Sequence, residues 1–351
     1  MATIQELYIQ SLLAQAAYAN LQIGIPQQSS LRQDANMSVT QAAEFASQWR
    51  VVNQLNDASV TGVSATLFEE IATGKKYLAV RGTEFTNVPD LLADYVLSNG
   101  FPSTMNLQYQ KLKQTIDTWT ANGTIPINFT VTGHSLGGYL ASALAIDYGS
   151  RISATYTYNA PGVDGIFSPI VNVLRSALGV SGNAPLANLI NVRGTAGWSA
   201  IAGVGNQLSP PLMVETETNI NPVLHHSIVN LTDSLSLLNV FAQLDATLSV
   251  DAGNKIIAAA SNQESAERER ALDAIRKIIQ GSTSIPTQID NRENYYQNLQ
   301  DLQNSSTFKA LAGKLQITAT TANAESAKSD FGQFLSLYYL TPFTVSTPDA
   351  G

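Results

Sequence analysis

Residues 129–148 combine a strand pattern, a glycine-rich turn and a helix pattern around one serine. Apolar residues and threonines alternate before the turn, which predicts a β-strand, and small and apolar residues recur at helical spacing after it. The turn reads Gly133-His-Ser-Leu-Gly137, so that a glycine lies two positions to either side of Ser135. We call residues 133–137 the serine turn. A serine in this setting is expected to adopt a strained backbone conformation, because only glycines let the strand and the helix approach so closely.

This arrangement predicts that Ser135 is a nucleophile. The turn lifts the Ser135 Oγ above the sheet edge, and the first backbone N–H of the following helix, that of Leu136, faces the place where an oxyanion would form. A second oxyanion donor is expected at Thr83, which follows a predicted strand and the dipeptide Arg81-Gly82. The five-residue motif alone is weak evidence, and the strand before it and the helix after it make it specific.

Composition limits the partners and the class of protein. The chain has 351 residues, which favours one domain of about 250 residues with an appendage. A net charge of −8 argues against nucleic acid as a partner, and the absence of cysteine excludes disulfides and thiolate metal sites. The sequence contains no run of eighteen apolar residues, so no transmembrane segment is predicted. Few charged residues and many small polar ones favour a secreted protein, although the N-terminus shows no signal peptide.

Periodicity along the chain predicts an α/β fold. A hairpin is expected between residues 62 and 83, and further strands at 154–158, 189–192 and 212–214. Because helical patterns separate the later strands, we expect right-handed crossovers and a mainly parallel central sheet flanked by helices. Near the N-terminus, a helix is expected to begin near Ser38, with Gln41 in a capping box, and to continue to Leu55.

Two apolar segments lie beyond strand ends and have no place in this pattern. Residues 165–187 are expected to form a lid or the wall of an acyl-chain site, with a buried helix as the alternative, and residues 91–97 form a shorter apolar segment.

From Ser227 onward, helical patterning dominates. We therefore expect a catalytic domain over residues 1–250, an all-helical extension over 251–343 and a flexible tail over 344–351. Both charge signs are mixed between Glu264 and Arg276, which predicts a solvated helix face.

The run Gly133-His-Ser-Leu-Gly-Gly138, together with Val80-Arg-Gly-Thr83, resembles the bacterial type of the class 3 (fungal-lipase-like) α/β-hydrolases over about residues 35–235. The resemblance implies ester hydrolysis of the triacylglycerol lipase or phospholipase A1 type. It implies Ser135 as nucleophile, Thr83 and Leu136 as oxyanion donors, a lipid or ester substrate, transient contact with a lipid interface, and no cofactor. Calcium binding is left open. Residues 331–343 more weakly resemble the segment after such domains in exported bacterial proteins that carry glycine-rich calcium repeats.

A histidine base is easy to place because the chain has only three histidines. His134 lies inside the serine turn and is expected to point away from the nucleophile. His225 and His226 precede a helical pattern, where the family places its base. The sequence His-Ser-Ile favours His226, with His225 as the alternative.

The acid of a catalytic triad departs from the family pattern. The family carries an aspartate after the strand that is expected here at 189–192, yet the residues that follow, 193–198, contain no carboxylate. Asp164 is the first substitute, because some lipases of this fold place the acid after the preceding strand, although Asp164 could equally cap the segment that follows it. Glu215 and Glu217 are the second choice.

Two other functions remain open at this stage. A thioesterase or a peptidase could use the same scaffold and the same nucleophile. The missing acid also leaves room for a non-catalytic or weakly active binding module that keeps the fold.

Overall fold

The computed structural model describes most of the chain, with side chains from residue 107 in the helix that begins at 101 and up to 336 in the helix that ends at 339. The described residues are 2–57, 61–82, 101–162, 188–195, 202, 207–217, 226–260, 266–281, 284–320, 328–339 and 341–347.

The chain divides into two compact units. Unit 2 comprises Ile9–Leu212 and Ile220–Leu231, and unit 1 comprises Met1–Tyr8, Met213–Asn219 and Thr232–Gly351. The two units are groups of residues that pack together, and such groups do not test functional boundaries. The predicted division into a catalytic domain, an extension and a tail stays a prediction.

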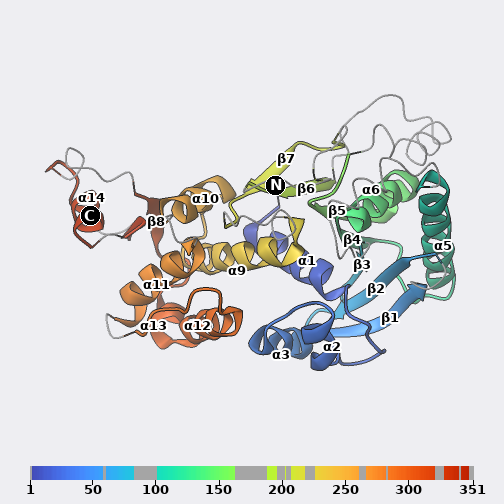
Figure 1. Cartoon of the computed structure of the whole chain (residues 1–351), viewed down its shortest axis with the longest axis horizontal. Coiled ribbons are helices and arrows are strands. Elements are labelled where there is room, and N and C mark those ends of the chain that lie inside the picture. Colours follow the sequence, from blue (N-terminus) through green and yellow to red (C-terminus); the bar gives the residue numbers. More distant parts are fainter. Residues whose placement is uncertain are drawn as a thin grey trace. The chain divides into compact units, whose positions relative to one another are not determined.

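Seven strands form one sheet in which the spatial order follows the chain order (Figure 1). They are β1 (Trp49–Asp57), β2 (Val63–Glu70), β3 (Lys76–Val80), β4 (Phe129–His134), β5 (Ile152–Tyr158), β6 (Leu189–Gly194) and β7 (Pro211–Val214). β1, β2 and β3 pair antiparallel, and β3, β4, β5 and β6 pair parallel. The predicted hairpin is therefore β2–β3, and the mainly parallel sheet is confirmed.

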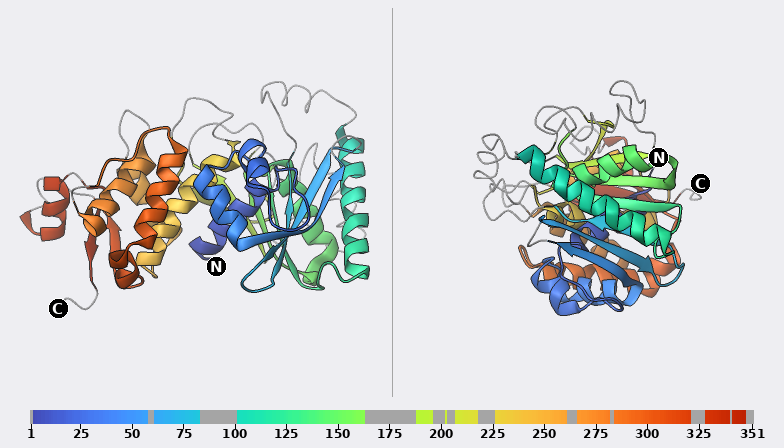
Figure 2. Two further views of the ribbon diagram at one scale, coloured as in Figure 1. Left: turned by 90° about the horizontal axis from the view of Figure 1, so that it is seen from below. Right: turned by 90° about the vertical axis from the view of Figure 1, so that its right-hand side faces the viewer.

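Helices cover both faces of this sheet (Figure 2). Val131 of β4 faces a core that it shares with α5 and α6. On the opposite face, Phe45 of α3 packs edge to face on Phe68 of β2, and the Thr132 hydroxyl donates to the Gln10 carbonyl of α1 at 3.0 Å. The helices from the N-terminus to β5 are α1 (Ile4–Ala16), α2 (Gln28–Gln33), α3 (Val39–Gln48), α5 (Phe101–Ala121), α6 (Leu136–Tyr148) and the 3₁₀ turn η1 (Gly149–Arg151).

The helix expected from Ser38 to Leu55 is correct only in its first part. Ser38 and Gln41 form the predicted capping box, but α3 ends at Gln48 and the chain continues as β1. The expectation of helix over 49–55 is wrong because this segment pairs antiparallel with β2 along its whole length. Ladder hydrogen bonds to a partner strand override a three- and four-residue spacing of apolar side chains.

Helices dominate the C-terminal part, as predicted. This part of the chain also contains a short two-stranded sheet. The helices are α9 (Ile228–Leu244), α10 (Val250–Ala259), α11 (Glu267–Gln280), α12 (Arg292–Asn304), α13 (Ser306–Leu311) and α14 (Phe331–Tyr339). β8 (Gln316–Ala319) and β9 (Phe343–Ser346) form an antiparallel pair that the sequence did not predict. The first residues of the expected flexible tail therefore belong to a strand.

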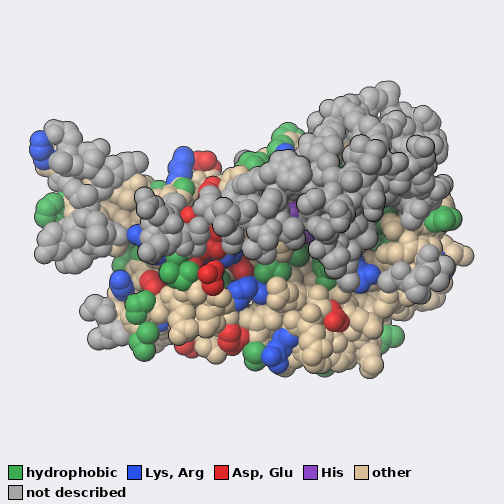
Figure 3. All heavy atoms as spheres, in the orientation of Figure 1, with side chains coloured by type: hydrophobic (Ala, Val, Ile, Leu, Met, Phe, Trp, Pro, Cys, Tyr) green, Lys and Arg blue, Asp and Glu red, His purple; other side chains and the backbone are tan. Residues whose placement is uncertain are grey.

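Most of the charged residues of α11 do not lie on the solvated face that we expected, although Arg270 and Lys277 are exposed. Arg268, Glu269 and Arg276 are all buried. Arg268 is ion-paired with Glu217, and Arg276 with Asp273 at 2.8 Å. The pattern of mixed charges thus marks ion pairs inside unit 1, while other acidic and basic side chains lie interspersed on the surface (Figure 3).

Two glycines let β4 and α6 meet at the serine turn. A Cβ on Gly133 would lie 2.4 Å from the Gly137 carbonyl oxygen, and one on Gly137 would lie 2.2 Å from the Val80 carbonyl oxygen. Both neighbours are backbone atoms, which cannot move aside as a flexible side chain can. The close approach of three elements at this point therefore requires glycine.

Gly137→Ala is expected to lower the free energy of unfolding by about 3 kcal/mol or more, because the added methyl group would separate β3 from α6. Gly74→Ala is the control, since Gly74 has a positive φ but no atom lies within 4 Å of the place that a Cβ would take, and it should cost about 1–2 kcal/mol. Urea denaturation measures both. Equal losses would contradict the requirement for close approach.

Candidate active site

Ser135 occupies the strained position that the sequence predicted. Its backbone has φ 56° and ψ −128°, a region that residues other than glycine rarely adopt. The residue lies between the end of β4 and the start of α6, and its N–H donates to the Tyr158 carbonyl of β5 at 2.9 Å. The side chain is almost fully buried within the described residues.

His226 lies in direct hydrogen-bond contact with this serine. The distance between His226 Nε2 and Ser135 Oγ is 2.8 Å. Burial, and to a smaller extent the neighbouring His134, hold the pKa of His226 well below its usual value. The imidazole is therefore neutral at neutral pH, and its Nε2 can accept the serine proton.

Two donors hold the backbone of His226. Its carbonyl oxygen accepts hydrogen bonds from His134 Nε2 at 2.7 Å and from Asn159 Nδ2 at 3.1 Å. Asn159 directly follows β5 and has a positive φ of 46°. Its Oδ1 accepts the Gly194 N–H at the end of β6, at 3.1 Å. The ends of three neighbouring parallel strands thus converge on the main chain of the histidine.

His134 has a fixed tautomer. A carbonyl oxygen can only accept, so His134 Nε2 carries the hydrogen, and Nδ1 accepts the Tyr18 hydroxyl at 2.7 Å. Burial lowers the pKa of His134 to about 4. The sequence predicted only that this ring avoids the nucleophile; it binds the backbone of the residue that contacts the nucleophile.

Asn159 and Tyr18 were missed by the sequence analysis. Asn159 had a usable signal, because a polar residue directly after a buried parallel strand faces the same sheet edge as the serine turn. Tyr18 follows α1 and carried none, since nothing local links it to His134 across more than a hundred residues.

The oxyanion side of the site is described in part. Leu136 is the first residue of α6, so its N–H has no acceptor within the helix. A Cβ on Gly82 would lie 3.2 Å from the Ser135 Cβ, which places the chain just after β3 against Ser135. Thr83, the next residue, lies outside the described residues.

The predicted acid is not described either. Asp164, His225 and the apolar segments 91–97 and 165–187 all lie outside the described residues. Of the second-choice acids, Glu217 binds Arg268 through its carboxylate. Glu215 is tied through its N–H to the Asn254 side chain at 2.8 Å. The third member of a triad therefore stays a prediction.

Metal clusters and membrane-spanning helices are absent from the part of the chain that the structure describes. Within those ranges, no group of three or more acidic or histidine side chains is arranged to hold a metal ion. No helix among the described residues has the length and apolar character needed to cross a membrane.

Comparison with known proteins finds one matching family model and a set of similar folds. Residues 10–171 match the phospholipase-like family described as the Tle-like phospholipase domain. No curated protein matched the sequence.

Solved structures of fungal lipases align at low identity. The Lip2 lipase from Yarrowia lipolytica is 18% identical, with 58% of this chain and 78% of that chain covered and a TM-score of 0.37. A mutant form of MDLA from Penicillium cyclopium is 17% identical, with 62% and 82% covered and a TM-score of 0.39. A triacylglycerol lipase from Penicillium expansum is 12% identical, with 61% and 80% covered and a TM-score of 0.34. These TM-scores are low, so the alignments carry no argument about individual residues of this chain.

Replacing His134 should flatten the acid dependence of stability. The pKa of His134 is about 4 in the folded chain, against 6.5 ordinarily, so its contribution to the free energy of unfolding is complete above pH 6.5 and is lost as the pH falls towards 4. In His134→Gln the amide can still donate to the His226 carbonyl but does not titrate. We expect the loss of unfolding free energy between pH 7.5 and 4.5 to shrink by about 2–3 kcal/mol. An unchanged pH dependence, measured by urea denaturation, would show that His134 is not buried as a neutral ring.

Proposed function

We propose that this lipid ester hydrolase, whose residues 10–171 carry a Tle-like phospholipase domain, cleaves the acyl ester bonds of glycerophospholipids through an acyl-enzyme on Ser135. One observation carries the proposal: a strained serine at a strand-to-helix turn lies 2.8 Å from the Nε2 of a buried, neutral histidine. A serine without a base is a weak nucleophile, and this pairing is the arrangement that activates it.

The chemistry proceeds in two acyl transfers. His226 Nε2 takes the proton as Ser135 Oγ attacks the ester carbonyl, and it then gives that proton to the leaving alcohol as the carbon–oxygen bond breaks. A water molecule, deprotonated by the same nitrogen, then attacks the acyl-serine. The bond between the acyl carbon and Ser135 Oγ breaks, the fatty acid is released, and His226 returns the proton to Ser135 Oγ. The Leu136 N–H, at the positive end of α6, stabilises the oxyanion in both steps.

We assign the second oxyanion donor to Thr83. The close approach of Gly82 to the Ser135 Cβ supports this assignment, because Gly82 directly precedes Thr83 in the chain. The backbone N–H of Thr83 would act as the donor, and its hydroxyl would hold the loop in position.

We assign the acid to Asp164. It follows β5, whose carboxyl end lies next to that of β4, and the alternative Glu217 is already bound to Arg268. The apolar residues 91–97 and 165–187 supply the acyl-chain wall or lid in this proposal. Secretion, transient contact with a lipid surface and activity without a metal are further parts of it that rest on the sequence.

Ser135→Ala and His226→Ala should each reduce fatty-acid release from phosphatidylcholine vesicles by at least about 10³-fold. Ser142→Ala is the matched control, because Ser142 is a buried serine of α6 that bonds only the Gly138 carbonyl among the described residues. A fluorophosphonate probe should label the native chain and not Ser135→Ala. Hydrolysis that survives Ser135→Ala would contradict the proposal. Faster hydrolysis of thioesters or peptides than of phospholipid esters would show that the proposed substrate class is wrong. Phosphatidylcholine with two different acyl chains shows which ester is cleaved.

Asp164→Asn should lower kcat by about 10⁴-fold if the carboxylate orients and stabilises the His226 imidazolium. Glu215→Gln should leave kcat within about twofold of the native value. The reverse result would move the acid to Glu215.

A further inference from the structure

The segment that carries His226 leaves unit 1 and returns to it. Unit 1 contains Met213–Asn219 before this segment and everything from Thr232 after it, whereas Ile220–Leu231 belong to unit 2. The histidine is therefore connected along the chain, in both directions, to the unit that contains the C-terminal helices. Residues 218–225 lie outside the described residues, so the described link from His226 to unit 1 is α9, which begins two residues after His226 and contains Asp233.

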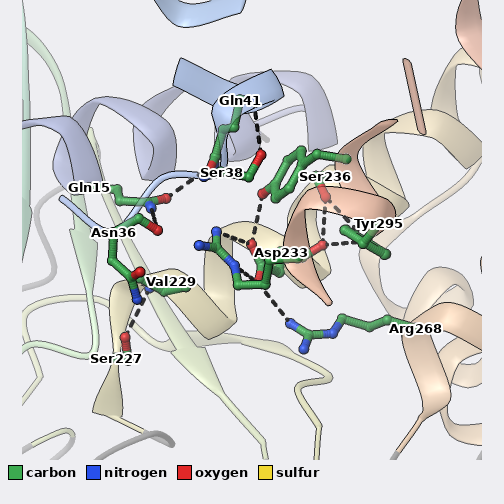
Figure 4. Close-up of polar contacts among 12 residues, drawn as sticks. Gln15, Asn36, Ser38, Gln41, Ser227, Val229, Asp233, Ser236, Arg268 and Tyr295 are labelled. Carbon is green, nitrogen blue, oxygen red and sulfur yellow. Dashed lines mark hydrogen bonds and ion pairs between the residues drawn. The ribbon is translucent and has the colours of Figure 1, made fainter. Parts of the chain in front are cut away.

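One guanidinium binds both flanks. Arg268 of α11 forms an ion pair with Glu217, before the segment. Its Nη1 lies 3.4 Å from the carboxylate of Asp233, after the segment (Figure 4). The side chains of all three residues are nearly inaccessible to solvent. Charges in such surroundings are costly to separate, because an unpaired buried charge loses its solvation without compensation.

Further contacts hold each flank. Before the segment, the Asn254 side chain of α10 donates to the Met213 carbonyl and accepts the Glu215 N–H, both at 2.8 Å.

After the segment, Asp233 receives two hydrogen bonds from Arg292, at 2.8 Å each, and one from the Tyr296 hydroxyl at 2.8 Å. The Tyr295 hydroxyl and Ser236 Oγ both donate to the Asp233 carbonyl (Figure 4). Asp233 is thus fixed through both its side chain and its main chain.

The protonation states favour this bridge at neutral pH. Burial acts to raise the pKa of Asp233, but the charges of Arg292 and Arg268 outweigh burial and lower it, so the carboxylate stays ionised. Burial and the nearby Glu217 raise the pKa of Glu269 to about 8. Glu269 is therefore protonated at neutral pH and does not compete with Glu217 and Asp233 for Arg268.

We propose that Arg268 is a positioning residue for His226: its guanidinium joins Asp233 to Glu217 and so fixes the start of α9, the helix that directly follows the imidazole. Arg268 touches neither the substrate nor the reacting atoms. The inference rests on the proposed function, since it assigns the C-terminal helices a part in the same reaction. A displacement of about 1 Å in a reacting group can lower a rate by about 10²-fold, so a change in how α9 is fixed is expected to change kcat.

The test is Arg268→Lys in the full chain, with Arg276→Lys as the control. Lysine keeps the positive charge but lacks the planar fork that reaches two carboxylates at once. Arg276 lies on the same helix and is equally buried, but its acceptors are Asp273, Thr287 and the Ile285 carbonyl, and none of these flanks the histidine segment. The two variants therefore make the same chemical change in similar surroundings.

We expect Arg268→Lys to lower kcat for phosphatidylcholine by about 10- to 100-fold with KM within about twofold, and Arg276→Lys to change neither. In chains labelled with ¹⁵N-histidine, which carry only three histidines, the ring signals of His226, assigned with His226→Gln, should shift or broaden in Arg268→Lys alone. Equal kcat values and equal His226 signals in the two variants would overturn the proposal.

The NMR measurement of the His226 signals tests this inference independently of the proposed function. A native chain that hydrolyses no ester would refute the function, while the His226 signals would still show whether Arg268 positions the ring. If Arg268→Lys does not fold, Glu217→Gln breaks the same bridge on one side without changing the side-chain shape, and it should produce the same shift of the His226 signals. Unchanged signals in that variant would also overturn the proposal.

Discussion

The strained backbone of Ser135 is the constraint on which the rest of the site depends. A residue held in such a conformation costs about 1–3 kcal/mol, and it persists only where its surroundings determine it. Here the surroundings are β4, paired on both sides, and α6, in which all residues except Asp147 are buried. The two glycines of the serine turn permit the contact that keeps these elements together. The core of the sheet thus supplies the stability that the strained geometry of the nucleophile requires.

The histidine is held by different means from the serine. His226 follows no strand of the sheet, and its position depends on hydrogen bonds from His134 and Asn159 to its carbonyl oxygen. Both donors are buried, so each would lose a hydrogen bond if the histidine moved, at a cost of about 1–3 kcal/mol for each unsatisfied group. Burial of the two imidazoles also keeps them neutral, which leaves His134 able to accept the Tyr18 hydroxyl and His226 able to accept a hydrogen bond from Ser135.

A gain in stability is a poor explanation for the ion pairs of unit 1. Removing charges from water costs several kcal/mol per ion, and apolar residues of similar size often stabilise a core as well or better. A network such as that around Asp233 is better explained by specificity, because directional hydrogen bonds to a planar guanidinium allow fewer arrangements than apolar contacts do. The joining of Glu217 to Asp233 by Arg268 is one such specific arrangement.

The sequence alone determined the features that depend on neighbours along the chain. Ser135, the glycines around it, the capping box at Ser38 and the β2–β3 hairpin follow from turn residues and from periods of 2 and 3.6, which are local properties. Tertiary structure decided the rest. The segment after Gln48 became a strand because a partner strand offered a ladder. Tyr18, Asn159 and Arg268 gained their places from residues far away in the chain, and Arg268 of α11 is buried because its acidic partners lie on other elements. Local patterns specify backbone conformation, whereas burial and pairing of side chains depend on which distant segments the fold brings together.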